Sequence, residues 1–150
     1  MDLQSVPATI THMNTHVLFL LFLISFYSFS QENKTIQKLD TELQNCLDDT
    51  QNNMMNCTFE YYTKIDNLLN VTYKKIRSTL SKPEQEKLKS QQLTWLKKRD
   101  LYFKKVAAET SSDLDGDHSS QDYRMICSHE NALFVENRIV ELEKIYLLKD

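Results

Sequence analysis

The sequence predicts an all-α fold: an antiparallel bundle of about four helices with a long central helical hairpin. Its 150 residues include one glycine and two prolines, so the tight turns of a β architecture lack the residues they need. Charged residues make up 26% and hydrophobic residues 41%, and apolar positions recur at three- and four-residue steps, the spacing of one helix face. One helical domain is therefore expected.

The first thirty residues are predicted to be a signal peptide. An apolar run begins at Val17, and Ser28-Phe29-Ser30 places small residues at a signal-peptidase spacing. The run is shorter than the roughly 20 residues that span a membrane. We therefore expect cleavage after Ser30 and a periplasmic or secreted domain over residues 31–150, with no membrane contact after removal. The segment before the run has no Lys or Arg, which leaves a retained anchor as the alternative.

Four helical segments follow, and their boundaries carry residues typical of helix ends. The first covers about 35–48, and Thr50 is the expected N-cap of the second. Ser81-Lys82-Pro83-Glu84 combines a capping box with a first-turn proline, so it ends the second helix and starts the third within a short hairpin connection. Residues 110–120, rich in Ser and Asp, end the third helix, and the fourth covers about 121–148. The apolar stripe of the second helix comprises Met54, Cys57, Tyr61, Ile65, Leu68, Thr72, Ile76 and Leu80.

Three cysteines follow Ser30, namely Cys46, Cys57 and Cys127. Export favours disulfides, and an odd count indicates one pair with one free thiol, or an intermolecular bond. No His lies near Cys46 or Cys57, so a zinc site is not predicted. The stretch 113–117 resembles a calcium loop but lacks its closing Glu, which favours a solvated linker. We expect neither a metal nor a cofactor.

Several functional classes are disfavoured by charge and motif content. The net charge of −3 is small and both signs are interspersed, so a nucleic-acid surface is not indicated. The single glycine excludes most phosphate-binding loops and nucleophile elbows. No catalytic residue is predicted, and the protein is not expected to be an enzyme.

Polar residues are spaced to meet across the hairpin. Asp66, Asn70 and Tyr73 share one helix face at i, i+4 and i+7. A facing set comprises Gln92, Trp95, Arg99 and Asp100. We expect a hydrogen-bond network in which Arg99 donates to Asp66. The network either fixes the register of the hairpin or lines a surface that recognises a partner, and a Trp at such a position is more typical of a core.

These positions also match a family pattern, because Asp66-x-x-Leu69-Asn70-x-x-Tyr73 precedes Gln92-x-x-Trp95-x-x-x-Arg99-Asp100, and Arg138-x-x-x-Leu142 follows. Over about residues 43–146 the chain resembles the lysozyme-inhibitor LprI-like domain, an exported helical family. The resemblance implies a Cys46–Cys57 disulfide. It also implies that Cys127 is unpaired, because Phe103 stands where the family often has the partner cysteine. Arg138 completes the signature residues, although its spacing of eleven from Cys127 is longer than usual.

By this resemblance the domain binds a protein and inhibits a lysozyme-type muramidase. Such enzymes work through two carboxylates, so an inhibitor is expected to present cations to the cleft. The candidates are Lys97, Lys98, Lys104 and Lys105, or the 110–120 loop. The alternatives are that these lysines only solvate a helix, and that the domain is a non-inhibitory envelope interaction or scaffold protein. The sequence gives no signal about oligomeric state.

Overall fold

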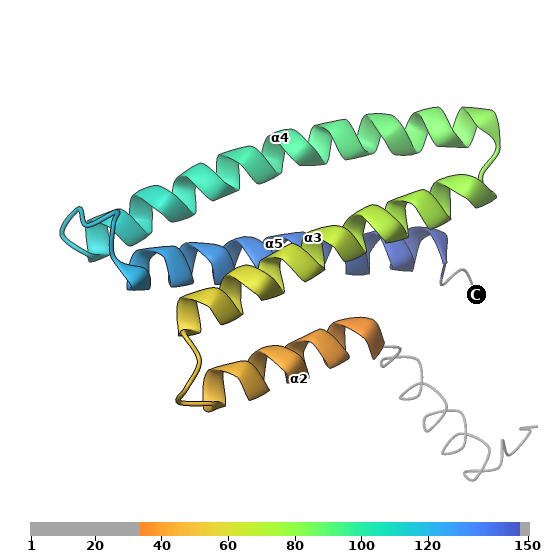
Figure 1. The fold of residues 1–150 in the computed structure, drawn as a ribbon. Helices are drawn as coiled ribbons and strands as arrows, with labels where there is room; N and C mark the ends of the chain where they lie inside the picture. The colour runs from red at the N-terminus through yellow and green to blue at the C-terminus, as the bar shows by residue number, and fades with distance from the viewer. Residues whose placement is uncertain (1–33, 148–150) are drawn as a thin grey trace, which may run out of the picture. The chain divides into compact units, whose positions relative to one another are not determined.

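A computed structural model describes residues 34–147, which fold into α-helices with no strand in that range. The helices are α2 (Lys34–Asp48), α3 (Met54–Thr79), α4 (Lys82–Asp113) and α5 (Gln121–Tyr146) (Figure 1). The predicted all-α class is confirmed. The predicted signal peptide, residues 1–30, lies outside the described residues. Within the described part of the chain, no helix is both long enough and apolar enough to cross a membrane.

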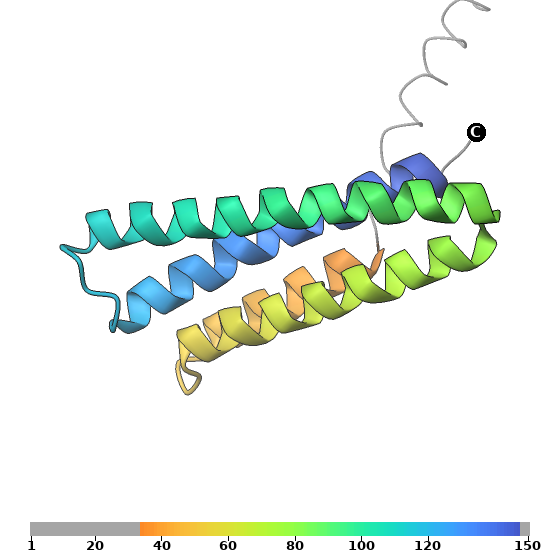
Figure 2. The same ribbon diagram turned by 90° about the horizontal axis from the view of Figure 1, so that it is seen from above.

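Helices α3 and α5 run side by side, α4 packs along α5, and α2 lies along α3 (Figures 1 and 2). Helix α5 packs against both α3 and α4, and its contact with α3 is the more extensive. Helices α3 and α4 are antiparallel neighbours in the chain, separated by Leu80 and Ser81. The long helical hairpin is therefore present, and α5 packs against both of its helices.

The core is formed by apolar side chains from the four described helices. Helix α5 contributes a stripe at the helical spacing that predicts one buried face. Trp95 and Leu88 face it from α4, and Ile36 of α2 completes the core at the other side of α3. Leu69 is 3% exposed, whereas Leu68, which the sequence assigned to the stripe, is only partly buried against the core. The most deeply buried side chains are Ile65, Ile76, Leu88, Ile139, Leu142 and Val135.

The start of α3 differs from the sequence-based prediction. Asn53, not Thr50, is the N-cap of α3, since its side chain accepts a hydrogen bond from the backbone of Asn56 at 3.3 Å. Thr50 lies within a turn that starts at Asp49, whose backbone oxygen accepts from Asn52 at 2.9 Å. Helix α3 therefore begins only at Met54. The side chain of Met54, which the sequence assigned to the apolar stripe, is 48% exposed.

The two other connections follow the predicted chemistry more closely. At the start of α4, Glu84 Oε2 accepts from the backbone of Ser81 at 3.0 Å and from its hydroxyl at 2.6 Å. The later loop is shorter than expected, because α4 continues to Asp113 and buries Thr110. Gly116 adopts φ of 83° there, a conformation that glycine allows at little cost.

Candidate partner-binding site

The eight signature residues separate into a buried group and a more open group. In the buried group, Arg138 of α5 is only 5% exposed and donates through Nε and Nη2 to Gln92 Oε1 of α4, at 3.2 and 3.1 Å. Its Nη1 donates to Glu141 at 2.8 Å. The guanidinium lies 5.8 Å from the ring of Trp95, which stacks on Phe134. These contacts satisfy a charge that is buried between two helices, as a buried guanidinium requires.

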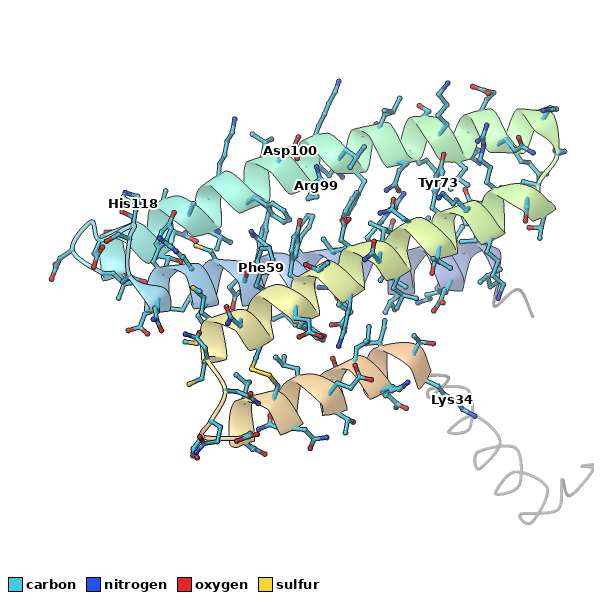
Figure 3. All side chains as sticks on the ribbon, in the orientation of Figure 1. Lys34, Phe59, Tyr73, Arg99, Asp100 and His118 are labelled. Carbon is cyan, nitrogen blue, oxygen red and sulfur yellow. A yellow bond between two sulfur atoms is a disulfide. The ribbon has the colours of Figure 1, made fainter. Side chains whose placement is uncertain are left out.

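The open group lies on α3 and α4. Asn70 Nδ2 donates to the backbone oxygen of Asp66 at 2.9 Å and to its carboxylate at 3.3 Å. Tyr73 packs partly buried against the core, and Figure 3 shows Tyr73 and Arg99 directed toward the space between α3 and α4. Asp66 and Asn70 therefore bond to each other along one helix, and the network expected across the hairpin does not form through them.

The expected donation from Arg99 to Asp66 is wrong. Arg99 donates instead to the carboxylate of its neighbour Asp100, from Nε at 3.1 Å and from Nη2 at 2.8 Å. Its guanidinium lies 5.9 Å from the ring of Trp95 and 5.6 Å from that of Phe103. This stacking on two rings of its own helix holds the cation beside α4.

Tyr62 joins the open group, although sequence reasoning missed it. Burial raises the pKa of its phenol, the negative charge of Asp66 raises it further, and the positive charge of Arg99 opposes both. Its ring meets Phe103 edge to face at 6.1 Å. The sequence could have indicated Tyr62 through its position four residues before Asp66, which places both on one helix face. The phenol stays neutral here and remains a potential hydrogen-bond donor.

The four candidate lysines are all exposed on α4. Lys105 lies 3.6 Å from Glu109 across one helical turn, whereas Lys97, Lys98 and Lys104 make no ion pair with any described residue. Among the described residues, the most exposed large hydrophobic side chain is Leu101, at 68%. The sequence analysis did not identify Leu101. Its position midway between two lysine pairs could have indicated it. We call Leu101 with Lys97, Lys98, Lys104 and Lys105 the lysine–leucine surface.

No group of three His, Cys, Asp or Glu side chains is placed to hold a metal ion within residues 34–147. In the loop that resembled a calcium site, Asp117 Oδ1 accepts from Ser119 and Ser120, and these bonds, led by that from the Ser119 side chain, lower the Asp117 pKa. A pocket of about 390 Å³ where α3 and α5 begin contains one ionisable side chain, Asp122. A single carboxylate supplies no acid–base pair.

The cysteines are arranged as the resemblance implied. Cys46 of α2 and Cys57 of α3 form a disulfide with their Cα atoms 5.8 Å apart. Cys127 of α5 is a free thiol. The disulfide ties α2 to the start of α3, next to the turn that precedes Asn53.

Comparison with known proteins supports the family resemblance seen in the sequence. The family model described as "Lysozyme inhibitor LprI" matches residues 33–142. No curated protein and no solved structure matches the chain. Because the family match covers most of the chain and includes both signature helices, this protein belongs to the lysozyme inhibitor LprI family.

Proposed function

We propose that this protein is an exported protein-binding domain that inhibits a lysozyme-type muramidase. The observation that carries the proposal is the family match over residues 33–142, whose description is that of an inhibitor. Fold alone does not assign function, so the proposal also needs a surface on this chain suited to such an enzyme.

The lysines of α4 supply such a surface. Muramidases of this kind work through two carboxylates that flank the scissile bond, and a bound inhibitor meets that negative charge. Lys97, Lys98 and Lys104 are exposed and unpaired within the described residues. The whole chain carries a net charge of −3, so this concentration of positive charge is local. Local charge complementarity favours encounter with an acidic cleft and rejects cationic partners.

Export is consistent with the covalent structure. The Cys46–Cys57 disulfide forms and persists in oxidising compartments such as the periplasm and the extracellular space. Muramidases act on the cell wall from the same side of the membrane. The disulfide therefore supports a location in the periplasm or outside the cell.

The test is a turbidity assay with purified protein and hen-type, goose-type and invertebrate-type lysozymes at stoichiometric ratios. We expect inhibition of at least one class at low micromolar concentration. Cells that receive the protein without enzyme are the control, because their turbidity must stay constant. If no class is inhibited and calorimetry detects no binding, the proposal fails, and a non-inhibitory envelope scaffold takes its place.

A further inference from the structure

We infer that Leu101 is the apolar anchor with which this domain enters the acidic cleft of a muramidase, and that the lysines around it hold the cleft carboxylates. The inference rests on the proposed function and specifies its contact surface. Its basis is Leu101, the most exposed large hydrophobic side chain among the described residues, and the lysines that surround it.

Helix geometry places Leu101 at the centre of the lysines. Lys97 and Lys98 precede it by four and three residues, and Lys104 and Lys105 follow it by three and four. Residues three and four apart are surface neighbours on an α-helix, and α4 is continuous from Lys82 to Asp113. All four lysines are exposed, and 68% of Leu101 is accessible to water. The result is an apolar centre with a charged rim, and an apolar core with a polar rim is the general anatomy of protein interfaces.

The helix that carries the lysine–leucine surface is anchored to the core through its opposite side. Trp95 and Val106 lie on the buried side of the same helix, and Arg99 is held by Asp100 and by the rings of Trp95 and Phe103. Leu101 therefore needs no backbone rearrangement to project outward. Preorganisation of this kind reduces the ordering cost of binding.

Charge complementarity selects the partner. The Arg99–Asp100 pair is neutral as a unit, and Glu109 offsets Lys105, so Lys97, Lys98 and Lys104 leave a net positive rim. A cleft that presents two carboxylates fits this rim. An anionic membrane is the weaker fit, since a helix that lies in a membrane surface needs a broad apolar face. The neighbouring exposed leucine, Leu93, lies eight residues from Leu101.

The experiment measures the inhibition constant against the most sensitive lysozyme class, with the complete exported protein. Leu101→Ala is expected to weaken inhibition about tenfold, and Leu101→Asp more strongly because it places a carboxylate in an acidic cleft. Lys97→Gln with Lys104→Gln is expected to weaken inhibition about tenfold and to reduce its dependence on salt. Matched controls on the same helix are Leu93→Ala and Lys87→Gln with Lys89→Gln, which should inhibit like the wild type. Thermal melting verifies that each variant is folded.

The outcomes separate the two proposals. If the wild type inhibits no class, the proposed function fails and the anchor fails with it. If the wild type inhibits and the Leu101 variants match the Leu93 control, the anchor is overturned while the function stands. Co-sedimentation with phosphatidylglycerol vesicles provides the last comparison. Membrane binding that Leu101→Asp abolishes, with inhibition intact, would also overturn the anchor and would assign Leu101 to a lipid surface.

Discussion

Arg138 of α5 donates two hydrogen bonds to the amide oxygen of Gln92 on α4, at 3.2 and 3.1 Å. A third bond to Glu141, at 2.8 Å, and the ring of Trp95 at 5.8 Å complete the surroundings of a guanidinium that is only 5% exposed. Arg138 thus links α5 to α4 at one relative position along their axes. It is shielded from solvent on one side by the only tryptophan of the chain.

Replacing Arg138 is predicted to act on stability. Arg138→Ala removes the bonds and leaves a cavity, so the free energy of unfolding should fall by about 3 kcal/mol. Arg138→Met fills the same space without a charge and should cost less, because a well-packed apolar side chain often replaces a buried charge at small cost. Urea unfolding followed by circular dichroism measures both. Equal losses in the two variants would show that the charge, not the packing, is what α4 and α5 require.

The Tyr61 hydroxyl links three helices, lying 2.5 Å from Asp40 Oδ1 of α2 and 2.9 Å from Glu136 Oε2 of α5. Tyr61→Phe is predicted to lower the free energy of unfolding by about 1–2 kcal/mol. It should also accelerate amide hydrogen exchange in α2 more than in α4, because α2 loses a polar contact to the bundle. Exchange measured by mass spectrometry distinguishes the helices. Uniform acceleration would contradict a specific role in docking α2.

The same phenol predicts a pH dependence. Burial, followed by the bonds to Asp40 and Glu136, raises the pKa of Tyr61 well above its ordinary value of 10.0. A raised pKa in the folded state contributes stability that is complete below the unfolded value and is lost as pH rises toward the folded one. Unfolding free energy should therefore decline above about pH 10. Tyr61→Phe should decline less, and parallel curves for the two proteins would exclude Tyr61 as the cause.

The disulfide is predicted to contribute about 3 kcal/mol, since it closes a loop of 11 residues in the unfolded chain. Cys46→Ser with Cys57→Ser should lower the melting temperature, and dithiothreitol should do the same to the wild type. Cys127→Ser is the matched control, because Cys127 is a free thiol. A comparable loss in this control would assign the effect to the removal of any thiol.

The sequence predicted the helices well because their ends carry local chemistry. Ser81 and Glu84 bond each other within four residues, and such a signal does not depend on the rest of the fold. The prediction that Thr50 caps α3 was wrong because Thr50 belongs to the turn that begins at Asp49. A turn and a cap use similar residues, so the pattern did not specify which would form.

The signature residues show where sequence reasoning stops. Spacing placed Asp66, Asn70 and Tyr73 on one face of a helix, but it did not reveal which side chains Arg99 would contact. Two aromatic rings on α4 and the adjacent Asp100 were nearer partners for the guanidinium. The same lack of distance information hid the pairing of Gln92 with Arg138, which are 46 residues apart.

Arg99 is predicted to shield Trp95, whose fluorescence then reports the contact. The guanidinium covers one side of the ring at 5.9 Å, and its side chain is 26% exposed, so removing it admits water. Arg99→Ala should shift the emission of the single tryptophan to longer wavelength and increase its quenching by acrylamide, at a stability cost of about 1 kcal/mol. Asp100→Asn is the control, because it weakens the ion pair and leaves the stacked guanidinium in place. An unchanged spectrum in Arg99→Ala would mean that Phe134 and Arg138 exclude water without help, and that Arg99 is available to a partner.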